Sequence, residues 1–366
     1  MKKPLRIVAD AHIWGVKQAF SYLSGFDVNL KVLEKEAITS QAIHDADILL
    51  TRSGTQVNAN LLQDSNVRFC GTATIGDDHY DKPWLEAQGI AWASAAGSST
   101  GSVLEYILAT LLELHVQQHV DLSRDSIGIV GAGRIGGQLV KICEALGISV
   151  LVNDPPRQCM EGDQGFVSLE YLLAHADIVS LHTPLIQQSE NRTYHLLDEM
   201  ALQRFQGKAI INAARGACVD NQALLGWLNQ TCGVAVLDCW EHEPDIELAL
   251  LQHQQCVIVT PHIAGHSLDG KAANTQFIYR ALCEYLGVQP EWDMHAMLPK
   301  LTCVAQEARG WHELHALINQ FYIIQNDSKQ FKASPKDFVS MRRYYPVRRA
   351  WDKQSSHLAD ILYPDK

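Results

Sequence analysis

The sequence predicts an α/β protein with doubly wound parallel sheets and a smaller C-terminal part, and three observations support this fold class. Short apolar runs rich in Val and Ile alternate with amphipathic stretches over most of the 366 residues, as in successive βαβ units. A glycine-rich turn joins one such run to a helix near residue 131. The composition, 47% hydrophobic and 19% charged, is typical of a globular protein with a large core, and the length suggests two or three domains.

The N-terminal part predicts a small doubly wound domain. Strands are predicted at residues 6–9, 47–51, 67–71 and 89–92, and amphipathic helices at 56–63 and 82–88. A long apolar helix is predicted at 100–119, and it leads into the glycine-rich unit.

Residues 125–156 contain the strand, turn, helix, strand and acidic residue of a dinucleotide-binding unit. The strands are predicted at 126–130 and 148–152. The glycines between them allow a sharp turn and a close approach of the backbone to a pyrophosphate at the helix N-terminus. The residues predicted to bind the cofactor here are Gly131, Gly133, Arg134, Ile135 and Gly136.

Asp154 follows the second strand, where a carboxylate accepts hydrogen bonds from a ribose 2′-hydroxyl. This position predicts NAD as the cofactor rather than NADP. Arg157, three residues further on, offers an alternative partner for a 2′-phosphate, but Asp154 would repel that phosphate.

The alternation resumes after Asp154 and predicts one parallel sheet of at least six strands. The remaining strands are predicted at 177–181, 209–212, 233–237 and 257–260, and the helices at 169–174, 221–230 and 269–286. Residues 287–290 break the pattern. Beyond Pro299 the chain has isolated aromatic residues and a basic cluster, which consists of Arg342, Arg343, Arg348 and Arg349.

Charge and composition exclude several function classes. The net charge of −11 argues against a nucleic-acid partner, which would require a basic face. The N-terminal residues contain no long apolar run, so we expect neither a signal peptide nor a membrane span. The nine cysteines contain no C-x-x-C pair and predict reduced, mostly buried thiols in a cytoplasmic protein.

Four motifs in the second half of the chain resemble the D-isomer-specific 2-hydroxyacid dehydrogenases. They are HTPL at 182–185, INAARGACVD at 211–220, LDCWEHEP at 237–244 and TPHIAGHS at 260–267. Their order and spacing match the family, and with the glycine-rich unit they cover residues 45–290 approximately. Three further segments, at 51–55, 71–79 and 342–351, resemble the branch that oxidises 4-phospho-D-erythronate to 2-oxo-3-hydroxy-4-phosphobutanoate in pyridoxal 5′-phosphate biosynthesis.

This resemblance implies an NAD-binding Rossmann domain, a flavodoxin-like substrate domain and a small C-terminal α+β domain that forms a homodimer. The expected bounds are 1–97 with 266–288 for the substrate (lid) domain, 98–265 for the NAD-binding domain and 289–366 for the dimerisation domain.

Oxidation of a 2-hydroxy acid needs a base for the hydroxyl proton, a cation for the carboxylate and a nicotinamide that accepts the hydride. His262 is the predicted base, because it follows the last strand at the carboxyl end of the sheet. Glu243 is expected to bond the far nitrogen of this imidazole, and Arg215 offers a two-bond fork for a carboxylate. His242 competes with His262 as the base, but the family motif places the base in TPH.

No metal site is predicted. His115 and His119 have the spacing of a metal-binding pair, but the H-E-x-x-H glutamate is missing and no third ligand is evident. Cys218 is expected to pack in the interior, because hydride transfer needs no covalent intermediate.

The family resemblance implies further contacts to cofactor and substrate. Thr183 is expected on the nicotinamide side and Asp238 at the carboxamide, although Asp238 has an alternative role as a strand-end cap. Backbone contacts to the cofactor are expected from Ala213, Ala214, Arg215 and Gly265, and substrate contacts from Ser53, Thr72 and His266. His266 stands where the branch has a tyrosine, which changes the pH dependence of that contact.

Two other functions stay open. One is a D-2-hydroxyacid dehydrogenase acting on glycerate, hydroxypyruvate or phosphoglycerate, but the C-terminal segment fits such enzymes poorly. The other is an NADH-sensing protein without turnover, which would not need Arg215, Glu243 and His262 together.

Overall fold

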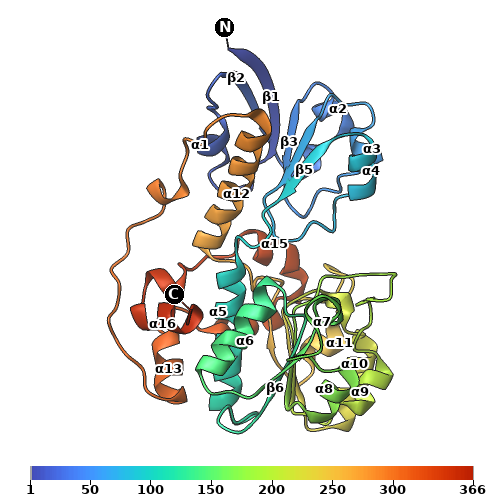
Figure 1. Cartoon of the computed structure of the whole chain (residues 1–366), viewed down its shortest axis with the longest axis vertical. Helices are drawn as coiled ribbons and strands as arrows, with labels where there is room; N and C mark the ends of the chain where they lie inside the picture. Colours follow the sequence, from blue (N-terminus) through green and yellow to red (C-terminus); the bar gives the residue numbers. More distant parts are fainter. Residues whose placement is uncertain (1, 366) are drawn as a thin grey trace. The chain divides into compact units, whose positions relative to one another are not determined.

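The computed structural model describes residues 2–365 and forms two compact units. Unit 1 comprises Met1–Ser99 and Ser267–Lys300, and unit 2 comprises Thr100–His266 and Leu301–Lys366. Figure 1 shows the chain coloured along the sequence.

Unit 1 is a parallel sheet whose strand order, β2-β1-β3-β4-β5, is that of flavodoxin-like folds. The strands are β1 (Lys3–Asp10), β2 (Phe26–Leu33), β3 (Ile48–Thr51), β4 (Phe69–Thr72) and β5 (Ala91–Ser94). The helices are α1 (Val16–Phe20), α2 (Ser40–Ile43), α3 (Ala59–Leu62), α4 (Lys82–Ala87) and α12 (Leu268–Leu286), with short 3-10 turns at Lys35–Ala37 and Met294–Ala296.

Helix α12 returns to unit 1 from late in the chain and lies along its sheet (Figure 1). Ile278, Tyr279 and Leu282 are buried in one apolar cluster with Leu5 and Ile7 of β1. The helix ends at Gly287, whose φ of 68° is in the left-handed region favoured at helix C-termini, so the predicted break at 287–290 is confirmed.

Unit 2 is built on a six-stranded parallel sheet with the order β11-β10-β9-β8-β6-β7. The strands are β6 (Ile127–Val130), β7 (Val150–Asn153), β8 (Ile178–Leu181), β9 (Ala209–Asn212), β10 (Val234–Leu237) and β11 (Cys256–Val259). The helices between them are α5 (Thr100–Val116), α6 (Arg134–Ala145), α7 (Pro155–Glu161), α8 (Leu169–His175), α9 (Glu199–Arg204), α10 (Asn221–Gln230) and α11 (Leu248–Gln252), with a 3-10 turn at Gly216–Cys218. The predicted six-stranded parallel sheet is confirmed.

The strand order reverses between β6 and β8, because the chain runs outward to β7 and then crosses back. In open parallel sheets, ligands bind at the carboxyl ends of the strands at such a switch point. The usual dinucleotide-binding order has one more strand beyond the position of β7. Here β7 is the edge strand, and the N–H of Val167 donates to the carbonyl of Val152 at 2.8 Å on that side.

The C-terminal segment is helical, so the expectation of an α+β segment at 289–366 is wrong. Its helices are α13 (Trp311–Ile318), α14 (Ile324–Ala333), α15 (Phe338–Arg343) and α16 (Ser356–Leu362), with 3-10 turns at Pro335–Asp337 and Trp351–Lys353. Extended pairing of its described residues is limited to isolated bridges, such as the one between Val304 and Ser355.

This segment does not have a core of its own from residue 301 onward. Leu314, Leu317, Trp351 and Leu358 are at most 4% exposed and belong to the same apolar cluster as α5 and α6. Figure 1 shows α13 and α16 beside these two helices. The segment is too short to bury its apolar side chains alone, and it therefore completes unit 2.

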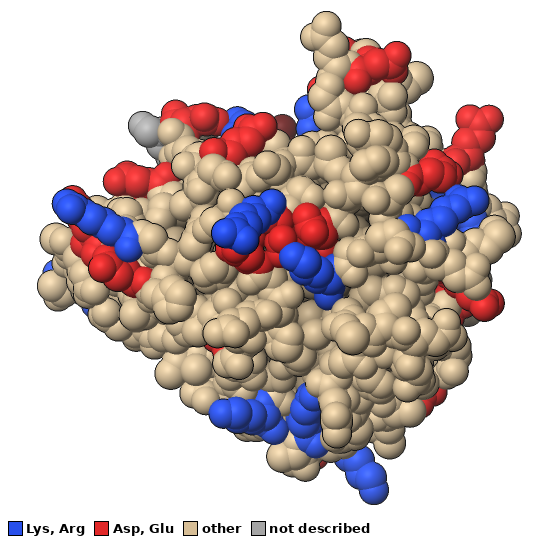
Figure 2. Space-filling view, turned by 90° about the horizontal axis from the view of Figure 1, so that it is seen from below, with Lys and Arg blue, Asp and Glu red and all other residues tan. Residues whose placement is uncertain are grey.

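Figure 2 shows the distribution of charged side chains on one face of the molecule. Lys, Arg, Asp and Glu side chains are scattered among uncharged residues there, and charges of opposite sign adjoin one another near its centre. A continuous basic face, which nucleic-acid binding requires, is not seen on this side. In the described part of the chain, every helix is too short or too polar to cross a membrane.

Glycines at the turn between β6 and α6 give a stability prediction. A Cβ at Gly136 would lie 1.9 Å from the carbonyl oxygen of Gly131, whereas a Cβ at Gly133 would meet nothing within 4 Å. We expect Gly136→Ala to lower the free energy of unfolding by about 1–3 kcal/mol and Gly133→Ala to leave it almost unchanged. Thermal unfolding of both variants measures this, and equal melting temperatures would contradict the close packing of β6 against α6.

Candidate active site

The glycine turn after β6 lies against the end of β8, on the two sides of the switch point. Gly131 has a φ of +86°, and a Cβ there would lie 3.0 Å from the backbone carbonyl of His182 and 2.9 Å from the Thr183 side chain. Gly133 faces open space just before α6 begins at Arg134. The turn therefore brings Thr183 beside the predicted cofactor glycines and leaves room for a diphosphate at the start of the helix.

Asp154 is held beside the same turn. Its carboxylate accepts the N–H of Ala132 at 2.8 Å and the N–H of Arg157 at 3.0 Å, so it caps α7. The Arg157 guanidinium donates to both oxygens of Glu161 at 2.7 Å and to the carbonyl of Ala132 at 2.6 Å. Because these contacts occupy Arg157, the alternative partner for a 2′-phosphate is disfavoured.

The loop after β9 is fixed by Asn212, which the sequence analysis did not single out. Its buried side chain donates to the carbonyl of Arg215 at 3.0 Å and accepts the N–H of Ala214 at 3.1 Å. At Gly216 a Cβ would lie 1.8 Å from the carbonyl oxygen of Trp240. The loop that carries Arg215 is therefore packed directly on the backbone that follows β10.

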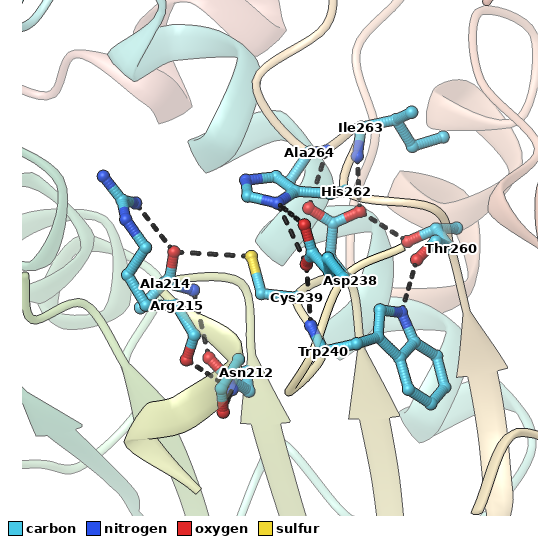
Figure 3. A network of polar contacts seen from close by, with 12 residues as sticks. Asn212, Ala214, Arg215, Asp238, Cys239, Trp240, Thr260, His262, Ile263 and Ala264 are labelled. Carbon is cyan, nitrogen blue, oxygen red and sulfur yellow. Dashed lines mark hydrogen bonds and ion pairs between the residues drawn. The ribbon is translucent and has the colours of Figure 1, made fainter. Parts of the chain in front are cut away.

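Arg215 extends its side chain from this loop, and Nη1 donates to the carbonyl of Ala214 at 2.8 Å (Figure 3). Ala214 is buried, and Ala213 is partly buried against the apolar cluster of α5 and α6. A guanidinium at the carboxyl end of a central strand is suited to hold a carboxylate by two hydrogen bonds.

Asp238 fixes the loop after β11. Its carboxylate, 1% exposed, accepts hydrogen bonds from the Thr260 hydroxyl at 2.7 Å and from the N–H groups of Ile263 and Ala264 at 2.7 and 3.0 Å. Burial raises the pKa of Asp238, and the charge of His262 and these hydrogen bonds act against that rise. The contacts are those of the alternative role, a strand-end cap, and contact with a carboxamide stays a prediction.

His262 and Glu243 form the predicted pair. Nδ1 of His262 lies 2.8 Å from Oε2 and 3.1 Å from Oε1 of Glu243 (Figure 3). The N–H of Trp240 donates to Oε1 of Glu243 at 2.8 Å. The His262 and Glu243 side chains are 26% and 18% exposed.

Electrostatics keep Glu243 ionised. Burial alone would raise its pKa, but the charge and hydrogen bond of His262, the charge of Arg342 and the Trp240 N–H outweigh burial and lower it. An ionised carboxylate accepts the proton on Nδ1, so Nε2 of His262 is the nitrogen left for an external proton.

His242, the competing histidine, has none of these features. It is exposed, has a φ of 58° and makes no side-chain hydrogen bond within residues 2–365. His242 therefore lacks the carboxylate partner that His262 has in Glu243.

One group of side chains has the composition of a metal site. Ligand atoms of Cys239, Glu243 and His262 lie within 4.8 Å of one another. However, the Cys239 thiol donates to the carbonyl of Ala214 at 3.3 Å, and burial with the nearby charges of Asp238 and Glu243 raises its pKa well above the usual value. A protonated thiol and a carboxylate already paired with His262 are poor metal ligands.

Three further residues considered in the sequence, His115, Cys218 and Gly265, lie in unit 2. His115 accepts the N–H of Leu122 at 3.3 Å and packs against Trp311 and His312, a structural role. Cys218 is buried, with its thiol 3.5 Å from the Thr183 hydroxyl, as expected for packing. Gly265 is partly buried in the loop after His262.

Ser53 and Thr72 lie at the carboxyl ends of β3 and β4 in unit 1. Ser53 is exposed, whereas the Thr72 hydroxyl is buried and lies 2.7 Å from Thr74 Oγ1 and 3.0 Å from His79 Nε2. His266 belongs to unit 2, and its ring centroid lies 6.1 Å from that of Tyr345. Their contacts with a substrate stay predictions.

Comparison with known proteins identifies the family. Residues 112–264 match the family model described as the D-isomer specific 2-hydroxyacid dehydrogenase, NAD binding domain. Erythronate-4-phosphate dehydrogenase of Azotobacter vinelandii is 43% identical over 95% of this chain and 93% of its own length. Its namesakes in Pseudomonas fluorescens and Proteus mirabilis are 41% and 39% identical, over 94% and 95% of this chain and 93% of each relative.

Solved structures with lower sequence identity share the fold. D-lactate dehydrogenase of Aquifex aeolicus, complexed with NAD and lactic acid, gives a TM-score of 0.65 at 21% identity, covering 77% of this chain and 95% of that one. NAD-bound 3-phosphoglycerate dehydrogenase of Entamoeba histolytica gives 0.64 at 18% identity, covering 78% and 96%. The chain therefore belongs to the NAD-dependent D-isomer-specific 2-hydroxyacid dehydrogenases, within the branch of the erythronate-4-phosphate dehydrogenases.

Proposed function

We propose that this protein oxidises 4-phospho-D-erythronate to 2-oxo-3-hydroxy-4-phosphobutanoate with NAD, a step of pyridoxal 5′-phosphate biosynthesis. The observation that carries the proposal is the match of almost the whole chain, C-terminal segment included, to relatives named for this reaction. The paired His262 and Glu243, with Arg215 on the neighbouring loop, support it.

In the proposed mechanism, Nε2 of His262 removes the proton from the substrate 2-hydroxyl as the C–H bond breaks and the carbonyl forms. Glu243 holds the imidazole in one tautomer and stabilises the imidazolium that results. Arg215 binds the substrate carboxylate and so orients the 2-carbon. NAD, when bound, supplies the acceptor for the hydride.

The cofactor is held in this proposal by the glycine turn and the strand ends around it. Gly131, Gly133 and the first amides of α6, at Arg134 and Ile135, take the diphosphate, and Asp154 takes the adenosine ribose. Thr183, Ala213, Ala214, Asp238 and Gly265 are proposed for the nicotinamide side.

Two cations of unit 1, Arg52 next to Ser53 in the chain and Lys271, whose pKa the charge of Arg52 lowers, support a phosphorylated substrate. Lys271 of α12 is partly buried and has no ion pair within the described residues. Burial and the positive charge of Arg52 together lower the pKa of Lys271 to about 8. An anion bound there would relieve this repulsion, so we assign Arg52, Ser53 and Lys271 to the substrate phosphate or carboxylate, with Thr72 and His266 as further contacts.

We also propose a cytoplasmic homodimer that associates through the C-terminal segment. All nine cysteines are free, as expected in a reducing compartment. The segment exposes large apolar side chains, with Tyr344 at 69%, Val339 at 47% and Ile323 at 46%. Light scattering on the full chain, 40.7 kDa per copy, tests the dimer.

A second candidate function is oxidation of an unphosphorylated or three-carbon acid, since 3-phosphoglycerate dehydrogenase shares the fold. A panel of 4-phospho-D-erythronate, 3-phosphoglycerate and glycerate with NAD and NADP separates the candidates. The rate of each reaction is measured from the absorbance of the reduced cofactor. We expect kcat/KM to be highest for 4-phospho-D-erythronate with NAD. A higher value for glycerate, or equal rates with both cofactors, would overturn the assignment.

Replacement of the base gives a second test. His262→Ala should lower kcat about 10²-fold or more, because a positioned general base contributes at least this much. NADH affinity, measured by fluorescence, should change little. His242→Ala is the matched control and should retain nearly full turnover, and the reverse ranking would mean that His242 is the base.

The Lys271 assignment predicts a pH dependence. The folded-state pKa of Lys271 is about 8, so its charge is present below pH 8 and is lost as the pH rises further. The KM for 4-phospho-D-erythronate should therefore rise above pH 8. Lys271→Met should raise this KM at pH 7 and remove that rise, whereas Lys82→Met, whose lysine pairs with Asp77 at 2.8 Å, serves as a control. An unchanged KM in Lys271→Met would exclude the contact.

A further inference from the structure

Arg348, in the C-terminal segment, contacts residues next to two of the three places where the chain passes between the units. The chain enters unit 2 at residues 99/100, leaves it at 266/267 and re-enters it at 300/301, and Arg348 contacts the backbone close to the first two. Nη2 of Arg348 donates to the carbonyl of Ser102 at 3.0 Å, and Nη1 donates to the carbonyl of His266 at 3.0 Å. One guanidinium therefore connects the first turn of α5 with His266, the last residue of the turn that begins at His262.

The guanidinium is buried and held from several sides. Its side chain is 7% exposed, and it lies 3.2 Å from the carboxylate of Glu105, which is 1% exposed. The Trp351 N–H donates to the other Glu105 oxygen at 2.6 Å, and the Tyr322 ring centroid lies 4.3 Å from the guanidinium. Because a buried charge must stay with its partners, this arrangement fixes one position for Arg348.

A cluster of arginines such as Arg342, Arg343, Arg348 and Arg349 can form a solvated basic face or bind a substrate phosphate, and the contacts of Arg348 argue against both roles for this residue. A side chain 7% exposed is not part of a solvated basic face. Its two terminal nitrogens already donate to backbone carbonyls and pair with Glu105, so a substrate phosphate would have to displace them.

Hydrogen bonds within one turn connect the backbone of His266 to the residues next to the proposed base, His262. His266 donates its N–H to the carbonyl of Ile263 at 2.8 Å, and Ile263 donates its own N–H to Asp238 at 2.7 Å. The turn from His262 to His266 is thus held by Asp238 at one end and by Arg348 at the other. His262 has a φ of 56°, which a non-glycine residue keeps only when its surroundings impose it.

We propose that Arg348 is a positioning residue for the dehydrogenase reaction, acting through the backbone of His266. It sets the turn 262–266 against α5 and thereby fixes the His262 imidazole and the His266 side chain for the substrate. The inference rests on the proposed role of His262. A displacement of about 1 Å at a reacting group costs on the order of 10²-fold in rate, so such a contact is detectable without touching the substrate.

Arg348→Lys is the deciding variant, because it keeps the positive charge beside Glu105 but lacks the planar fork that reaches two carbonyls in different directions. We expect a fall in kcat/KM of about 10-fold or more, with the NADH dissociation constant, measured by fluorescence, within about twofold of the wild-type value. Arg348→Met should lose more activity than Arg348→Lys, so that the conservative variant gives partial rescue. Arg309→Met, which changes a side chain 89% exposed in the same segment, is the control and should retain wild-type kinetics.

A purely structural role predicts a different result. The melting temperature of Arg348→Lys would fall, while kcat and KM of the folded protein stayed at wild-type values, and this would overturn the inference. The comparison uses whichever 2-hydroxy acid the wild-type protein oxidises. Failure of wild type on 4-phospho-D-erythronate alone therefore counts against the proposed substrate, and equal kinetics of Arg348→Lys and wild type count against the positioning role.

Discussion

The carboxylate of Asp238 is the constraint on which the candidate site depends. It is almost fully buried and has no solvent to compensate for its desolvation, so it keeps its three hydrogen bonds to Thr260, Ile263 and Ala264. These bonds shape the loop that presents His262. The contact between Gly216 and the Trp240 carbonyl brings the Arg215 loop against the same strand end. The two loops that carry Arg215 and His262, the residues proposed for carboxylate binding and proton transfer, therefore share one support at the end of β10.

Patterns that recur in the sequence predicted much of the fold. Short buried strands such as β9 and the glycine turn after β6 have strong local signals, since apolar β-branched runs and glycines act over a few residues. The edge strand β2 was missed because the predicted strands were continuous apolar runs. In β2 the polar residues Asp27, Asn29 and Lys31 alternate with apolar ones, which is the pattern of a strand covered on one face only. The short helices α2 and α7 were also missed, because one or two turns give a weak periodic signal, although α4 and α8, which are of similar length, were predicted.

Site residues that belong to a sequence motif could be predicted. Site residues that come together only when the chain folds could not. The pairing of His262 with Glu243 followed from family motifs and is present in the structure. The roles of Asn212, Lys271 and Arg348 depend on partners that are distant in sequence or on burial, which no local pattern reveals. The helical nature of the C-terminal segment was missed for the same reason, because its aromatic residues are buried against distant parts of unit 2. Tyr322 and Trp351 lie in the cluster of α5 and α6, and Phe331 and Phe338 lie in the cluster of Trp240.

The interleaved connectivity has a consequence for synthesis of the protein on the ribosome. Domains usually fold as they emerge, N-terminal part first. Here unit 1 requires α12 for its core, and unit 2 requires α13, α16 and Trp351 for its own. Neither core can close during translation until its late segment has left the ribosome. Until then the nascent chain exposes the apolar surface of the unit 1 sheet that α12 covers and the apolar surface of α5 and α6 that the C-terminal helices cover. A chaperone that shields these surfaces has its longest opportunity on unit 2, whose last buried core residue is Leu362.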